Sequence, residues 1–97
     1  MFYNKKGMKE IRFNQDKNTK LKSTRGIGFD EVAKLIKEVK TTTIEHPNKK
    51  RYPKQRISLV KIKNHIYAVP FVEEDDYIFL KTIYPSEKYT KKLLKIK

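Results

Sequence analysis

The apolar residues of this chain recur at two different spacings, one typical of helices and the other typical of strands. In the first half, Val32, Leu35, Ile36 and Val39 lie three and four positions apart, as on one face of a helix. The preceding residues 28–31, Gly-Phe-Asp-Glu, have the layout of a capping box with glycine in place of Ser or Thr. This pattern predicts a helix that starts after Gly28 and packs its apolar stripe on a core.

A more polar segment precedes that helix. Residues 15–25 are compatible with a helix, Asn14 is a suitable N-cap, and Gly26 stands where a left-handed residue commonly ends one. Leu21 is the one large apolar residue in the segment, so we expect a surface helix with a narrow contact. Residues 11–13 alternate between apolar and polar, which predicts a short strand before this helix.

The second half of the chain carries apolar blocks of strand length. A β-branched run covers residues 41–44, and further strands are predicted at 57–62, 66–72 and 77–84. The interval between the strands at 57–62 and 66–72 suits a hairpin turn, in which Asn64 tolerates the left-handed conformation. Pro70 has no N–H to donate to a neighbouring strand, so a bulge or a local edge is expected there.

These elements predict an α+β fold. Two N-terminal helices are expected to pack on an antiparallel sheet that has a three-strand meander at its centre. Ser86 is expected to cap a C-terminal helix, which contains Tyr89, Leu93 and Leu94. The length predicts a single domain over residues 1–97, in which residues 1–8 show no period and are interpreted as a loose leader.

Composition narrows the classes of function. The chain has 24 Lys and Arg against 11 Asp and Glu, and this net charge of +13 attracts polyanions strongly. Nucleic acid is the first partner to expect, ahead of an anionic membrane surface and an acidic protein. The lysines are spread through the predicted loops, helices and strands, which disfavours a membrane-surface helix. No apolar run approaches the roughly 20 residues that span a bilayer, and the lack of cysteine excludes disulfides and fits a cytoplasmic protein.

The loop from Glu45 to Arg56 concentrates the candidate chemistry. It holds one of the two histidines, His46, and five of the 24 Lys and Arg side chains. A solvated basic loop is the simpler interpretation of such a segment. His46 and His65 lie 19 positions apart, with no cysteine and no partner at ligand spacing, so neither a metal site nor a cofactor is expected.

Cleavage of RNA needs few protein groups, because the 2′-hydroxyl of the substrate is the nucleophile. The enzyme has to move protons and stabilise the negative charge that develops on phosphorus. His46 is the candidate for proton transfer near pH 7, and Arg51 and Arg56 can hold phosphate oxygens. Lys81 interrupts an apolar strand, either as an edge-strand gatekeeper or as a further transition-state ligand. The remaining candidates contact RNA by stacking or by charge: Tyr52, Tyr84, Lys49, Lys50 and Lys54.

The order of these motifs resembles the BrnT family of bacterial type II toxins, which are small ribonucleases with a RelE-like fold. Residues 11–17, Ile-x-Phe-Asn-x-x-Lys, occupy the place of the family's Phe-x-Trp-Asp-x-x-Lys. Residues 25–31, Arg-Gly-Ile-Gly-Phe-Asp-Glu, occupy the place of its Lys-His-Gly-Val/Ile-Ser-Phe-Glu-Glu. His46 matches the histidine that follows a strand in the family, and Arg56 matches the arginine before its next strand. The resemblance covers nearly the whole chain from about residue 9.

The resemblance implies a RelE-like domain and a toxin that cleaves RNA without a metal, inhibits translation and is neutralised by a cognate antitoxin. In that family the antitoxin is a ribbon-helix-helix protein, and a charge of +13 suits an antitoxin whose toxin-binding segment is acidic. The resemblance also adds Lys17 to the catalytic candidates. Glu87 stands where the family has an arginine, and Lys81 or Lys88 is the cation that can replace it.

The sequence leaves two other classes of function open. A non-catalytic RNA-binding or ribosome-binding module would bind RNA in a salt-sensitive way without cutting it. A repressor or antitoxin would use the same charge to bind DNA, although the sequence offers no identifiable recognition helix.

Overall fold

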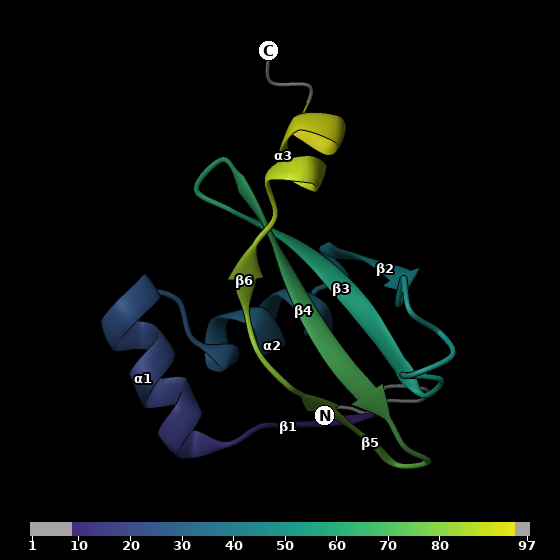
Figure 1. Ribbon diagram of the computed structural model, residues 1–97. Helices are drawn as coiled ribbons and strands as arrows, with labels where there is room; N and C mark the ends of the chain where they lie inside the picture. The colour runs from purple at the N-terminus through teal and green to yellow at the C-terminus, as the bar shows by residue number, and fades with distance from the viewer. Residues whose placement is uncertain (1–8, 95–97) are drawn as a thin grey trace.

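Residues 9–94, which the computed structural model describes, form three helices and a six-stranded sheet (Figure 1). The strands are β1 (Glu10–Arg12), β2 (Thr41–Glu45), β3 (Gln55–Ile62), β4 (His65–Glu73), β5 (Tyr77–Leu80) and β6 (Tyr84–Pro85). The helices are α1 (Gln15–Arg25), α2 (Phe29–Lys37) and α3 (Glu87–Leu94). The predicted α+β class is confirmed. The predicted leader, residues 1–8, and the side chains of Leu93 and Leu94 lie outside the described part of the chain.

The sheet is mixed rather than purely antiparallel. Its strand order is β1-β5-β4-β3-β2, so the predicted central meander of β3, β4 and β5 is confirmed. Lys63 and Asn64, with φ of 52° and 64°, form the predicted left-handed turn between β3 and β4. The antiparallel prediction is wrong at one edge, where β1 pairs with β5 in parallel and Ile11 lies opposite Ile78. β1 and β5 are not joined by a hairpin, so no turn in the sequence fixes their relative direction.

The strand predicted at residues 77–84 is interrupted. β5 ends beside Phe71 and β6 begins beside Ala68, so Lys81–Ile83 leave the ladder between them. Pro70 lies opposite this gap, and its carbonyl accepts a hydrogen bond from the Lys81 N–H at 2.8 Å. The ring nitrogen of Pro70 therefore faces the gap instead of a paired strand, which confirms the predicted local edge.

The start of α2 is capped by a side chain from α1. Asn14 and Gly26 bound α1 as predicted: Asn14 accepts a hydrogen bond from the Lys17 N–H, and Gly26 has a φ of 74°. Gly28 precedes α2 in an extended conformation and has no side chain with which to cap it. Asn18 of α1 is buried, and its Oδ1 accepts the hydrogen bond of the Phe29 N–H at 2.6 Å. One helix thus supplies the N-terminal hydrogen-bond acceptor of the next.

The end of α2 corrects the predicted apolar stripe. Val32 is fully buried, but Val39 is 80% exposed because the helix ends before reaching it. Val39 has a φ of 56°, the left-handed conformation that glycine normally adopts after a helix. Its N–H bonds to the Ile36 carbonyl at 3.0 Å, and the Lys40 N–H bonds to the Leu35 carbonyl at 2.9 Å. These two bonds form a Schellman motif, which stops the helix without a glycine.

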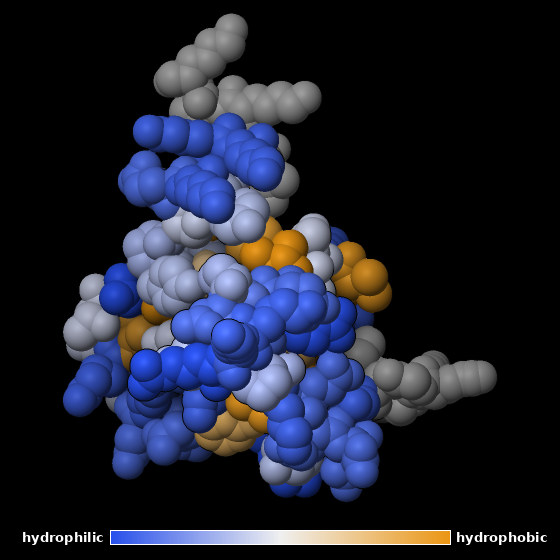
Figure 2. Space-filling view, turned by 45° about the vertical axis from the view of Figure 1, so that its right-hand side comes forward, coloured by the Kyte–Doolittle hydropathy of each residue, from blue (hydrophilic) through white to orange (hydrophobic). Residues whose placement is uncertain are grey.

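The sheet buries one apolar cluster on each face. α1 and α2 cover the larger cluster, whose most buried members include Phe29, Val32, Val60, Val69, Leu80 and Ile83. The opposite face carries Ile57, Leu59, Ile66 and Ala68, against which Tyr89 of α3 packs. Figure 1 shows α2 behind the sheet and α3 above its upper end. Figure 2 shows apolar surface directly below α3, so this opposite face, which we call the open face, is only partly covered.

Buried hydrogen bonds hold α3 on β4. Thr90 is buried, with 4% of the residue exposed, and its hydroxyl accepts the Ile66 N–H at 2.9 Å and donates to the Ser86 carbonyl at 2.7 Å. The Ser86 hydroxyl accepts the Tyr89 N–H at 3.2 Å, which confirms the predicted cap. Within residues 9–94, no helix combines the length and the apolar character that crossing a membrane requires.

Candidate functional site

The basic loop after β2 is organised by Asn48. Its carbonyl accepts a hydrogen bond from the Tyr52 N–H at 3.0 Å, and its Oδ1 accepts one from the Arg51 N–H at 3.2 Å. The Gln55 N–H then bonds to the Tyr52 carbonyl at 3.1 Å, where β3 begins. These turns give the loop a defined backbone between two strands that are already paired. Asn48 was not among the predicted site residues, although Asn after Pro is a recognisable turn signal.

His46 is anchored at the start of this loop. Its Nδ1 accepts a hydrogen bond from the Asn48 N–H at 3.0 Å, and its ring lies 4.6 Å from the Tyr52 ring, tilted by 41°. A neutral imidazole whose Nδ1 accepts a hydrogen bond carries its proton on Nε2. Among the hydrogen bonds of residues 9–94, none involves this Nε2. His46 therefore presents an N–H donor, and it has to break the bond to Asn48 before Nδ1 can take a proton.

The cations of the loop are mostly exposed. Lys49 makes an ion pair with Glu45 at 3.7 Å between two exposed side chains, an arrangement that contributes little to stability. The Arg51 guanidinium lies 5.6 Å from the Tyr52 ring centroid, within the range of a cation–π contact. Lys50 and Lys54 are exposed. Tyr52 is half-buried and lies near both the imidazole and the guanidinium, so the predicted members His46, Arg51 and Tyr52 do lie together.

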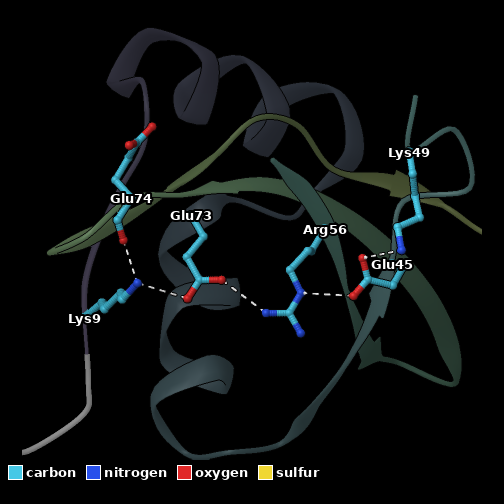
Figure 3. A network of polar contacts seen from close by, with 6 residues as sticks. All are labelled: Lys9, Glu45, Lys49, Arg56, Glu73 and Glu74. Atoms are coloured by element: carbon cyan, nitrogen blue, oxygen red, sulfur yellow. Dashed lines mark hydrogen bonds and ion pairs between the residues drawn. The ribbon is translucent and has the colours of Figure 1, made fainter. Parts of the chain in front are cut away.

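Arg56 is neutralised by two carboxylates, as Figure 3 shows. Its Nη1 donates to Glu73 at 3.1 Å, and its Nε lies 3.9 Å from a Glu45 oxygen. Glu73 also accepts a hydrogen bond from the Lys9 ammonium at 3.0 Å. In the ladder Arg56 lies opposite Phe71, which belongs to the core beneath α1 and α2. The structure thus directs Arg56 to the helix-covered face and engages it in ion pairs, whereas the sequence predicted a phosphate ligand.

The same network makes the stability of the fold depend on the ionisation of Glu73 at acid pH. The hydrogen bond from Lys9, followed by that from Arg56, lowers the pKa of Glu73 below its ordinary value. A lowered pKa in the folded state stabilises the fold at pH values above the unfolded glutamate pKa of about 4.3, and this contribution is lost as pH falls through the lowered value.

We expect Glu73→Gln to remove this part of the acid dependence. The free energy of unfolding should fall at pH 7 and change less than that of the unmodified protein between about pH 5 and pH 2. Urea unfolding at a series of pH values measures both. Glu74→Gln is the matched control, because among residues 9–94 the Glu74 carboxylate makes no ion pair. Parallel pH profiles for Glu73→Gln and the unmodified protein would contradict the assignment.

A pocket on the open face joins the loop to α3. Its volume is about 310 Å³, and Ile57, Leu59 and Ala68 form its apolar base. Tyr84, Lys88 and Tyr89 line it from the C-terminal side, and Glu45 and Pro47, the residues on both sides of His46, line it from the other. Two predicted RNA-binding residues, Tyr84 and Lys88, are therefore brought next to the His46 loop. Tyr89 is a third aromatic or basic group there.

The two remaining predicted residues lie elsewhere. Lys17 and Lys81 line a separate pocket of about 460 Å³, together with Asn14, Asp16, Lys20 and Phe79. β5, which ends just before Lys81, is separated from β2 by β4 and β3, so the axes of β5 and β2 are roughly 14 Å apart at ordinary strand spacing. The sequence grouped all these cations in one site, but the topology divides them between two edges of the sheet.

Comparison of the chain with protein-family models, curated proteins and solved structures found no match. The assignment of function therefore rests on the chemistry of the residues. Within residues 9–94, no three His, Asp or Glu side chains are grouped as ligands for a metal ion.

Proposed function

We propose that this protein is the toxin of a type II toxin–antitoxin system, a metal-independent endoribonuclease that inhibits translation. The observation that carries the proposal is the contact of His46 with Tyr52 in a loop of exposed cations, beside a pocket lined by Tyr84, Lys88 and Tyr89. This arrangement offers a proton-bearing imidazole, cations for phosphate and aromatic rings for bases in the loop and the pocket next to it. The resemblance of the sequence to the BrnT family, whose members have a RelE-like fold, also supports the proposal.

In this proposal, the loop and α3 hold one RNA segment between them. Arg51 and Lys88 bind phosphate oxygens, and the tyrosines position the bases next to the scissile bond. The Nε2–H of His46 donates to a phosphate oxygen when substrate first binds. Release of the Asn48 bond then frees Nδ1 to take the proton of the 2′-hydroxyl as its oxygen bonds to phosphorus. The Nε2–H passes its proton to the 5′ oxygen as the bond between phosphorus and that oxygen breaks.

The proposed partner is an antitoxin with an acidic segment, of the ribbon-helix-helix type that accompanies BrnT-like toxins. A net charge of +13 favours rapid association with such a segment. An acidic segment that lies over the His46 loop and Lys88 would exclude RNA from the same cations, which explains how binding neutralises the toxin.

The proposal is tested by incubating the purified protein with single-stranded RNA in the presence of EDTA. We expect cleavage that leaves a 2′,3′-cyclic phosphate or 3′-phosphate end, because the 2′-hydroxyl attacks phosphorus. Cleavage that requires a divalent metal, or RNA that stays intact both in solution and on ribosomes, would contradict the proposal.

A non-catalytic RNA-binding module is the second candidate, and two observations favour it. Arg56 is already held by Glu45 and Glu73, and the Nδ1 of His46 is already bonded to Asn48. Both predicted reactive groups are thus engaged within the protein. Salt-sensitive binding of RNA without cleavage in the same assay would support this candidate.

A further inference from the structure

The edge of the sheet formed by β1 and β5 carries a second set of aromatic and basic side chains. Tyr77 and Phe79 lie two positions apart on β5, so both point to the open face. The Arg12 guanidinium lies 4.0 Å from the centroid of the Tyr77 ring. The Lys81 ammonium lies 5.6 Å from the centroid of the Phe79 ring. Each half-buried ring on this strand therefore has a cation beside it.

α1 adds two more cations to the same edge. Lys17 and Lys20, three positions apart on one face of the helix, line the pocket of about 460 Å³ with Phe79 and Lys81. Asp16 also lines this pocket, so three ammonium groups oppose one carboxylate. Among the ion pairs of residues 9–94, none involves Lys17, Lys20 or Lys81. The pocket therefore has a net positive charge that no side chain of the described part neutralises.

The state of Lys17 and Lys81 contrasts with that of Arg56. Arg56 forms ion pairs with Glu45 and Glu73, whereas the three pocket lysines are exposed and form none among the described residues. Clustered like charges repel one another, so their arrangement around a hollow with an aromatic wall stabilises an anionic ligand rather than the fold. Two aromatic rings on one strand, each with a cation beside it, match the requirements of a single-stranded nucleic acid, whose bases stack while its phosphates meet the cations.

We propose that the strip formed by Tyr77, Phe79, Lys81, Lys17 and Lys20 is a second binding site for single-stranded RNA, distinct from the His46 loop. This inference rests on the proposed function, because it takes RNA as the ligand. The strip holds a part of the RNA strand that lies away from the scissile bond. Lys17 and Lys81 therefore bind substrate instead of contacting the reacting phosphate. The site would make affinity depend on RNA length, while the chemical step stays with His46.

The test measures binding of a 2′-O-methyl oligouridylate of about 12 nucleotides, which spans a typical single-strand site and cannot be cleaved. The triple variant Lys17→Ala, Lys20→Ala, Lys81→Ala is compared with a control triple variant, Lys34→Ala, Lys37→Ala, Lys63→Ala. Both lower the net charge by three, so long-range attraction falls equally. Like the pocket lysines, Lys34, Lys37 and Lys63 are exposed and make no ion pair among the described residues.

We expect the pocket variant to bind at least tenfold more weakly than the control variant. In a plot of log affinity against log salt concentration, the slope for the pocket variant should be smaller in magnitude by about 2, since each phosphate contact contributes about 0.7 for single strands. Phe79→Leu, which keeps apolar volume but removes the stacking ring, should weaken binding about tenfold while thermal unfolding shows that the protein stays folded. Equal affinity and equal salt slope for the two triple variants would overturn the second site.

The outcomes separate this inference from the proposed function. If the unmodified protein cleaves RNA and both triple variants bind alike, only the second site fails. If the unmodified protein neither binds nor cleaves RNA, the proposed function fails as well. A polyglutamate peptide serves as a further probe. If the pocket variant loses binding to polyglutamate but not to the oligouridylate, the strip binds an acidic protein segment, and the RNA assignment is overturned.

Discussion

Replacing His46 with alanine is expected to lower the rate of RNA cleavage by about 10²- to 10⁴-fold, the usual contribution of one acid–base group. The imidazole is the one side chain of the loop that can exchange a proton near pH 7. The measurement is single-turnover cleavage of a labelled RNA by purified protein, together with growth of cells that express each variant. Retention of full cleavage and toxicity by His46→Ala would remove His46 from the mechanism.

Two further substitutions separate the roles of the two ring nitrogens. His46→Asn places an amide oxygen near the position of Nδ1, so it can accept the Asn48 N–H and keep the loop ordered. His46→Gln can present an amide N–H near the position of Nε2, which donates a hydrogen bond but cannot titrate. If proton transfer is required, both variants are as inactive as His46→Ala. Substantial activity of His46→Gln alone would assign His46 to hydrogen bonding of the phosphate.

The other histidine provides the control for these variants. His65 begins β4 beside the hairpin turn, and its ring lies 5.9 Å from that of Tyr67, outside the loop and the α3 pocket. His65→Ala is expected to cleave RNA at the unmodified rate. An equal loss in the His65 and His46 variants would indicate a general effect on the fold rather than a catalytic one.

Gly28→Ala is expected to destabilise the fold by about 2 to 4 kcal/mol, which corresponds to a drop in Tm of more than about 10 °C for a domain of this size. Gly28 is extended, with φ of −119° and ψ of 171°, so alanine meets no backbone strain there. Its methyl group would instead clash with Oδ1 of Asn18 and lie 2.7 Å from Cγ of Lys22. Asn18 is buried and caps α2, so moving it breaks the hydrogen bond to the Phe29 N–H.

Gly26→Ala is the matched control for this steric effect. Gly26 has a φ of 74°, and a methyl group placed there has no atom within 4 Å. The loss of stability in Gly26→Ala therefore comes from the left-handed backbone alone and is about 1 to 2 kcal/mol. Thermal and urea unfolding of the two variants should therefore show the larger loss for Gly28→Ala. The reverse order would contradict the role of Asn18 as the cap of α2.

The local elements were predictable where one residue type fixes the backbone. Asn14 and Gly26 define both ends of α1, and Asn64 defines the hairpin turn, because each acts through its own neighbours in the chain. The end of α2 at Val39 had no such signal in the sequence. Val39 belongs to the apolar stripe of α2 by spacing, yet it ends up exposed in the left-handed conformation that closes the helix. No glycine marks that end, so spacing alone could not locate it.

The candidate site was predictable only within the loop. His46, Arg51 and Tyr52 are close in sequence, and the turns around Asn48 keep them close in space. Tyr84 and Lys88 reach the loop because β6 pairs with β4 and α3 packs on the open face. Lys20 was not predicted, although its position one helical turn after Lys17 was a usable signal.

By itself, the sequence determined the α+β class, the positions of the helices and most strands, and a charge that favours anionic partners. Only the tertiary structure decided which cations act together. It placed Arg56 between Glu45 and Glu73 on the covered face, and it left Lys17 and Lys81 without an ion pair among the described residues, in a pocket near the β1–β5 edge. The reason is physical: turns and caps depend on neighbours in the chain, whereas the surroundings of a charge depend on strand order and register, which bring together residues far apart in sequence.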